Sequence, residues 1–178
     1  VEIFNACWPM YAAMPAVLMD AIERSYQKVG WDLRNSESEK GIFPTFFDLL
    51  DILPGVIEES HYSKDTQSDY VGALCTRVKS LTNGIYGSVL CAEDALSDAE
   101  MFDQNVIVDL SRVGSMETKS LLMGILVMKL QEYRMCSSGM NSRLCHVTVL
   151  EEAHNLLRKT SAEQSQEGAN LQGKSVEM

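Results

Sequence analysis

The sequence predicts an α/β fold, in which a helical first half is followed by parallel strands. Three observations lead to this prediction. Apolar residues recur at helical spacing in the first half, two short runs rich in β-branched residues occur in the second half, and a long helical pattern separates those runs. A crossover of this length joins parallel strands, and such units are right-handed almost without exception. We therefore expect a helical region and an incomplete parallel sheet.

The first half contains three helical patterns. The first spans 9–29 and stops at Gly30, because glycine adopts the backbone conformation that ends a helix. The second begins with a cap at Thr45 and is expected to break at Pro54. The third spans 69–81. The residues expected to face the core are Met14, Val17, Leu18, Ala21, Ile22, Phe46, Leu49, Leu50, Leu53, Val71, Leu74, Cys75, Val78 and Leu81.

The second half has the pattern strand, helix, strand. The runs 105–110 and 146–150 are short, apolar and β-branched, which is typical of buried strands. Between them Ser115 caps a long helix that is apolar on nearly every side over 121–130, so we expect this helix to lie buried against the sheet. Residues 84–91 are a candidate for one further short strand.

Composition limits the classes of function. The 178 residues are 46% hydrophobic and 22% charged, which suits one domain with its own core. The net charge of -10 argues against a general nucleic-acid grip, because duplex binding needs a basic face. The five cysteines are odd in number and lack C-x-x-C spacing, so we expect a reduced, cytoplasmic setting. No apolar run approaches the roughly 20 residues that span a bilayer.

Two adjacent carboxylates, Glu151 and Glu152, follow the second predicted strand. Open α/β folds bind ligands at the carboxyl edge of the sheet, where these side chains would emerge. Asp109 and Arg112 end the earlier strand at the same edge and either frame the site or form a salt-bridged loop. The alternative is a helix start whose first turn carries acidic residues for the helix dipole.

These segments resemble a known family. The heptapeptide from Glu151 to Leu157 resembles the Walker B segment of HerA-like ATPases, which belong to the HerA/FtsK superfamily of P-loop proteins. Residues 105–135 look like the strand and helix that precede Walker B in that family, and the stretches 3–6, 15–18 and 43–45 are similar to its helical insertion. The resemblance therefore covers most of the chain and implies an incomplete P-loop NTPase-type parallel sheet with an α-helical insertion.

The resemblance also implies a function. HerA-like proteins are hexameric, ATP-driven DNA translocases or helicase-like motors that often work with a nuclease or another effector. On this mapping Glu152 polarises the attacking water, Glu151 lies on the side of the Mg²⁺ ion, directly or through a water, and His154 is a candidate sensor. The family more often has Asp at the first of these positions. The division implied is a helical insertion over 1–84, a Walker B core over 85–160 and a flexible tail over 161–178.

The same resemblance implies that the chain is an internal piece of a longer ATPase. The phosphate loop of the family precedes the helical insertion, and the arginine finger follows Walker B. Since a phosphate cradle is needed to position the nucleotide, we expect no tight binding of ATP or Mg²⁺ and no activity from this piece alone.

A second motif matches the phosphate-loop pattern G-x-x-x-x-G-K-S. It comprises residues 168–175, with Gly168, Gly173, Lys174 and Ser175 as its key positions. A true phosphate loop follows a buried strand, whereas the polar residues 161–167 precede this one. Two alternatives to the motor thus stay open: a nucleotide-binding protein that uses 168–175, and a non-catalytic helical interaction module in which the acidic pair only starts a helix.

Overall fold

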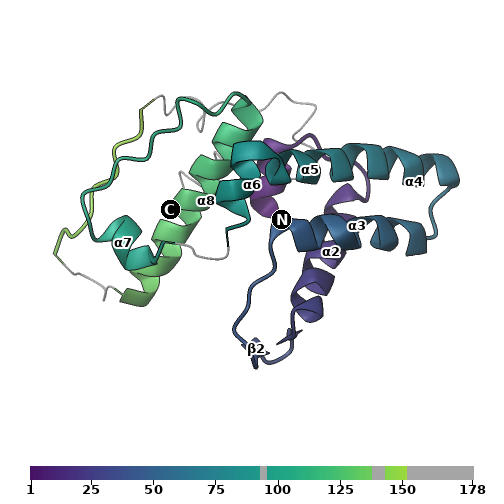
Figure 1. Ribbon diagram of the computed structural model, residues 1–178, viewed down its shortest axis with the longest axis horizontal. Helices are drawn as coiled ribbons and strands as arrows, with labels where there is room; N and C mark the ends of the chain where they lie inside the picture. Colours follow the sequence, from purple (N-terminus) through teal and green to yellow (C-terminus); the bar gives the residue numbers. More distant parts are fainter. Residues whose placement is uncertain (93–95, 138–142, 152–178) are drawn as a thin grey trace. The chain divides into compact units, whose positions relative to one another are not determined.

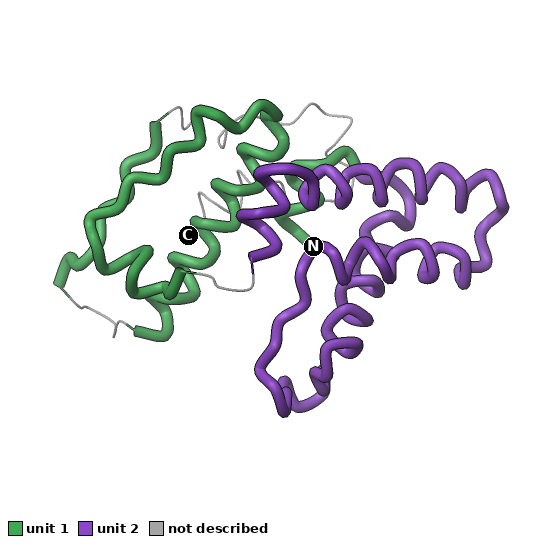
Figure 2. Tube along the Cα trace, in the orientation of Figure 1, with its two compact units in different colours: residues 1–9, 95–178 green, residues 10–94 purple. Residues whose placement is uncertain are grey.

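The computed structural model describes residues 1–92, 96–137 and 143–151. The chain divides into two compact units, which Figure 2 shows in different colours. Unit 1 comprises Val1–Pro9 and Ala95–Met178, and unit 2 comprises Met10–Asp94. Within the described residues, no helix is both long and apolar enough to cross a membrane.

Unit 2 is built from helices that follow one another along the chain, and in Figure 1 α4 runs on into α5 as one rod. A π-helical turn, η1, joins these two helices without a loop. The elements are α2 (Met14–Lys28), β1 (Trp31–Asp32), β2 (Glu37–Ser38), α3 (Phe46–Glu59), α4 (Lys64–Tyr70), η1 (Val71–Cys75), α5 (Thr76–Thr82) and α6 (Gly84–Leu90). The three helices predicted for the first half are therefore confirmed.

The core of unit 2 forms where α3 packs against α2 on one flank and against η1 and α5 on another. Most of the side chains predicted to face inward are buried there, and Leu18, Leu53 and Leu74 are wholly inaccessible. The predicted core residues that are only half-buried are Ile22, Phe46, Leu50, Val71 and Cys75. Burial of each such side chain contributes about 1.5–3 kcal/mol. A capping box begins α3, since the Thr45 backbone N–H donates to Asp48 Oδ2 at 2.9 Å. The packing thus follows from the helical spacing in the sequence.

Two local predictions for unit 2 are wrong. The helix α3 does not break at Pro54 but continues to Glu59, because Val56 and Ile57 beyond the proline are buried in the core. Residues 84–90 form the helix α6 rather than a strand. A tight turn after α5 permits this, since a Cβ at Gly87 would lie only 2.1 Å from the backbone oxygen of Thr82.

Unit 1 has three helices in its described part: α1 (Glu2–Cys7), α7 (Asp98–Phe102) and α8 (Met116–Ser137). Both α1 and α7 pack against α8. The long helix predicted after Ser115 is confirmed, but its burial is not, because the apolar residues of α8 after Leu121 are mostly half-buried. The buried apolar side chains of unit 1 within the described ranges are Trp8, Phe102 and Leu121.

The predicted α/β fold with a parallel sheet is wrong. Among residues 1–92, 96–137 and 143–151, the only sheet is the antiparallel pair β1–β2, in which Trp31 lies opposite Ser38. The runs 105–110 and 146–150 are neither helix nor strand, and Ile107 and Val149 are 94% and 82% exposed. A strand needs a neighbour that pairs with its backbone, and no backbone–backbone hydrogen bond in the described part joins these two runs.

Candidate functional site

Glu151 is the predicted site residue that the structure describes. It lies in a turn at the end of the run 143–150, and its side chain is exposed. The other predicted site residues lie outside the described residues; they are Glu152, His154, Gly168, Gly173, Lys174 and Ser175. Asp109 is also exposed, and its carboxylate accepts a hydrogen bond from the backbone N–H of Ser111 at 2.8 Å. In the described part no ion pair joins Asp109 to Arg112.

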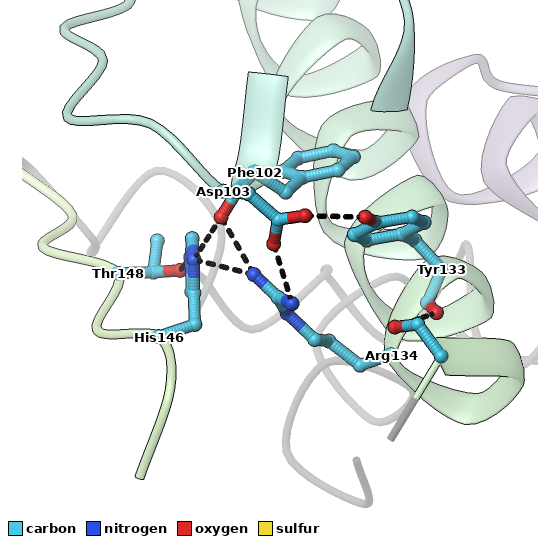
Figure 3. A network of polar contacts seen from close by, with 7 residues as sticks. Phe102, Asp103, Tyr133, Arg134, His146 and Thr148 are labelled. Atoms are coloured by element: carbon cyan, nitrogen blue, oxygen red, sulfur yellow. Dashed lines mark hydrogen bonds and ion pairs between the residues drawn. The ribbon is translucent and has the colours of Figure 1, made fainter. Parts of the chain in front are cut away.

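A polar network lies close to the run that carries Glu151, and Figure 3 shows its side chains. It joins three segments of unit 1: the end of α7, the last turns of α8 and the run 143–150. We call it the latch, and its members are Phe102, Asp103, Tyr133, Arg134, His146 and Thr148. In the latch, polar groups from three segments that are distant in the sequence converge.

The helix α7 brings Phe102 and Asp103 to the latch. A capping box begins this short helix, since the hydroxyl of Ser97 accepts from the backbone N–H of Glu100 and the Glu100 carboxylate accepts from the backbone N–H of Ser97. Phe102 is buried, with its ring centroid 6.0 Å from that of Tyr133. Asp103 follows as the C-cap of α7. The carbonyl of Phe102 and the carboxylate of Asp103 are thereby held at a fixed end of the helix.

Arg134, in α8, binds both the carbonyl of Phe102 and the carboxylate of Asp103. One guanidinium nitrogen, Nη1, lies 2.8 Å from Asp103 Oδ1, and the other, Nη2, donates to the carbonyl oxygen of Phe102 at 2.6 Å. The side chain of Arg134 is only 20% exposed, so water competes weakly for these contacts. Charge-assisted hydrogen bonds of a guanidinium fork are among the stronger polar contacts in proteins. Arg134 thus ties the end of α7 to α8.

Asp103 also accepts a hydrogen bond from the hydroxyl of Tyr133 at 2.5 Å. This bond and the neighbouring Arg134 lower the pKa of Asp103, because both favour the ionised carboxylate. The same bond raises the pKa of Tyr133, since its hydroxyl must keep its proton to donate. At neutral pH the latch therefore holds a charged aspartate, a charged arginine and a neutral tyrosine.

His146 connects the run 143–150 to this assembly. Its Nδ1 lies 2.9 Å from the carbonyl oxygen of Phe102, and because a carbonyl can only accept, Nδ1 carries the proton. Its Nε2 lies 2.8 Å from Oγ1 of Thr148. The 3.4 Å approach between Nδ1 and Nη2 of Arg134 thus brings together two donors that share one acceptor. Since both ring nitrogens are engaged, His146 is suited to holding the chain rather than to transferring protons.

The sequence pattern predicts the run that contributes His146 to the latch, but it does not predict the other members. His146 lies in a run that the sequence predicts as a buried strand, and in the structure it is hydrogen-bonded to the Phe102 carbonyl and to Thr148. The roles of Asp103, Tyr133 and Arg134 were missed, because 32 residues of sequence separate Phe102 from Arg134. A usable signal was the polar pair Tyr133-Arg134, which lies in the last turns of α8 after its apolar stretch 121–128.

Comparisons of the chain with protein-family models, with curated proteins and with solved structures find no match. The residues themselves set what the site can hold. No group of three or more His, Cys, Asp or Glu side chains within the described ranges is arranged to bind a metal ion. The carboxylate of Glu151 is a hard oxygen ligand of the kind that Mg²⁺ prefers, and Mg²⁺ in phosphate sites is bound by one or two carboxylates together with phosphate oxygens.

Proposed function

We propose that this chain is part of an ATP-driven DNA motor of the HerA-like type. In this proposal Glu152 polarises the water that attacks the γ-phosphate, and Glu151 lies on the magnesium side, directly or through a water. Mg²⁺ bound with ATP would neutralise charge on the phosphates. The order of the sequence segments supports the proposal, since the run 105–110, the helix α8 and the run 146–150 lead to the acidic pair as in that family.

One observation carries the proposal: an exposed carboxylate ends a run that the latch holds in place. Glu151 is exposed, whereas His146, five positions earlier, is tied to the end of α7. Hydrolysis of ATP needs a carboxylate that solvent and substrate can reach, on a segment that does not drift. The arrangement of Glu151 meets both needs.

The proposal includes the setting of the motor. We propose that it assembles as a hexamer in the cytoplasm, acts on DNA and works with a nuclease or another effector. The net charge of -10 implies that DNA is contacted by a local surface of the assembly rather than by the general charge of this chain.

The test is steady-state ATP hydrolysis by the full-length protein, with Mg²⁺ and duplex DNA present. Glu152→Gln keeps the size of the side chain but removes the charge that polarises water, so turnover should fall by at least about 100-fold while ATP still binds. The matched control is Glu132→Gln, which changes an exposed glutamate of α8 that is not part of the latch. Normal turnover in Glu152→Gln would falsify the assignment.

A second candidate is a non-catalytic helical interaction module. The helix α6 favours it, because Ile85 and Val89, one turn apart, are 72% and 68% exposed. The discriminating variant carries Glu151→Ala and Glu152→Ala together. Unaltered turnover of Mg-ATP in the full-length protein with both changes would favour the module over the motor.

The remaining alternative concerns residues 168–175. Calorimetric titration of this chain with Mg-ATP, beside the variant Lys174→Ala, separates it from the others. Tight binding that Lys174→Ala abolishes would identify a phosphate loop and overturn the proposed order of the segments. The motor proposal expects no tight binding to either protein.

A further inference from the structure

Packing contributes little to the position of the residues that lead to Glu151. Val147 and Val149 are 70% and 82% exposed, so their side chains bury little apolar surface. Within the described residues, the hydrogen bonds of 146–151 all involve His146, through the Phe102 carbonyl and through Thr148 Oγ1. Among the described residues, His146 is therefore the side chain that ties this short segment to the rest of unit 1.

The acceptor of this ring is itself well fixed. Phe102 is buried and its ring contacts that of Tyr133. Its carbonyl oxygen accepts hydrogen bonds from Arg134 and from His146. The carboxylate of Asp103 beside it forms an ion pair with Arg134 at 2.8 Å. A hydrogen bond can only position a segment if its far partner does not move, and this carbonyl meets that condition.

The contact with Thr148 carries the constraint toward the carboxylates. Oγ1 of Thr148 lies 2.8 Å from Nε2 of His146. The ring therefore binds the end of α7 through Nδ1 and the chain two residues further on through Nε2. Glu151 follows three positions after Thr148. The imidazole thus acts as a spacer between the fixed end of α7 and the start of the acidic pair.

We propose that His146 is a positioning residue for the carboxylate of Glu151, and that Arg134 and Asp103 hold the carbonyl on which it depends. This inference rests on the proposed function, because it assigns to the latch the task of placing a group that acts on ATP. His146 itself transfers no proton and touches no substrate. A displacement of about 1 Å can lower a rate by roughly 100-fold, so loss of the ring should appear in kcat.

The first experiment compares His146→Ala and His146→Asn in the full-length protein by ATP hydrolysis. The alanine variant should lower kcat by about 10- to 100-fold and leave KM for ATP within about twofold, since loosely held groups still allow binding. The amide nitrogen of asparagine takes the place of Nδ1 and can donate to the Phe102 carbonyl. The asparagine keeps the contact with the Phe102 carbonyl but has no atom that replaces Nε2 beside Thr148, so His146→Asn should recover only part of kcat and lie between His146→Ala and the unchanged protein. A purely structural role predicts equal loss of soluble protein in both variants.

The matched control removes another polar contact between α7 and α8. Nζ of Lys129 lies 2.9 Å from Oδ1 of Asp98, and neither residue is a member of the latch. Asp98→Asn should therefore leave kcat within about twofold of the unchanged protein. An equal loss of kcat in Asp98→Asn and His146→Ala would show that any weakening of the α7–α8 contact suffices, and would overturn the positioning role.

A second readout does not depend on ATP hydrolysis. Spin labels on cysteines introduced at Met135 and Val149, in a background without the natural cysteines, report the distance distribution between α8 and the run. His146→Ala should broaden that distribution, and Asp98→Asn should not. An unchanged distribution in His146→Ala would overturn the inference, whatever the enzyme does.

The outcomes separate the inference from the proposed function. Wild-type kcat in His146→Ala, together with loss of turnover in Glu152→Gln, would remove the positioning role and keep the motor. Normal turnover in Glu152→Gln would remove the motor and, with it, the catalytic purpose of the latch. The spin-label result would then still decide whether His146 holds the run.

Discussion

The two units of this chain hold themselves together by different means. Unit 2 buries apolar side chains from successive helices in one core, in which Leu53 and Leu74 are inaccessible. In unit 1 the runs rich in β-branched residues are exposed, as Ile107 and Val149 show. Three of its segments are joined through the polar latch around Arg134. Helices at 3.6-residue spacing can bury an apolar face locally, whereas β-branched runs need backbone partners that sequence neighbours do not supply.

The comparison teaches where substitutions should matter. In unit 2 the free energy of unfolding should depend on the volume of buried side chains. In the described part of unit 1 the free energy of unfolding should depend little on the exposed apolar runs. There the polar contacts of the latch should determine the local conformation. Two substitution pairs and one single substitution, measured as a function of pH, test these expectations in order of decreasing effect.

The largest effect is expected from the core of unit 2. Leu53→Ala removes a fully buried side chain and should lower the free energy of unfolding by about 2–5 kcal/mol, because it leaves a cavity. Ile107→Ala removes a side chain that is 94% exposed and should change it by less than about 0.5 kcal/mol. Urea unfolding followed by circular dichroism measures both. Equal losses of unfolding free energy in the two variants would mean that unit 1 has a closed core around 105–110. That result would contradict the contrast between the two units.

A smaller effect is expected from two glycines of unit 2. A Cβ at Gly87 would lie 2.1 Å from the backbone oxygen of Thr82, so Gly87→Ala must shift the turn between α5 and α6 and should cost about 1–3 kcal/mol. A Cβ at Gly55 in α3 would meet no atom within 4 Å, and Gly55→Ala should stabilise the helix by about 0.5–1 kcal/mol. Thermal unfolding should show shifts of opposite sign in Tm. A stabilising Gly87→Ala would contradict the close turn.

The smallest effect concerns the latch and depends on pH. Tyr133 and Arg134 lower the pKa of Asp103 in the folded chain, so the ionised carboxylate stabilises the fold above the ordinary aspartate pKa of about 3.9. That contribution is lost as the pH falls below this value, through the lowered pKa. Asp103→Asn should therefore be less stable than the unchanged chain at pH 6, and the difference should shrink toward pH 3. A difference in unfolding midpoint that stays constant over this range would show that the carboxylate charge is not involved.

Sequence reasoning succeeded where a structural element depends on its own residues. The spacing of Met14, Val17 and Leu18 predicted α2, and the cap at Thr45 predicted the start of α3. It failed at Pro54, because the break expected from a missing N–H is outweighed by the burial of Val56 and Ile57 beyond it. Local signals are reliable until packing at a distance opposes them.

The candidate site divides in the same way. The acidic pair Glu151-Glu152 is predicted as a site from the sequence, because an apolar run followed by carboxylates is a contiguous pattern. The latch that holds the approach to Glu151 was not found, since Phe102, Arg134 and His146 meet only after α7 has packed against α8. Contacts between residues that are far apart in the sequence leave no periodic signal.

The sequence by itself determined α2, α3 and the helical stretch over 69–81 in unit 2, the start of α8 after Ser115 and the carboxylate that follows the run 146–150, because each depends on propensity, capping or contiguous residues. Only the tertiary structure decided that the runs 105–110 and 146–150 lie exposed and unpaired with each other rather than in a sheet. It also decided that His146 binds the end of α7. The physical reason is that strand pairing and side-chain networks depend on partners whose distance along the chain the sequence pattern does not encode.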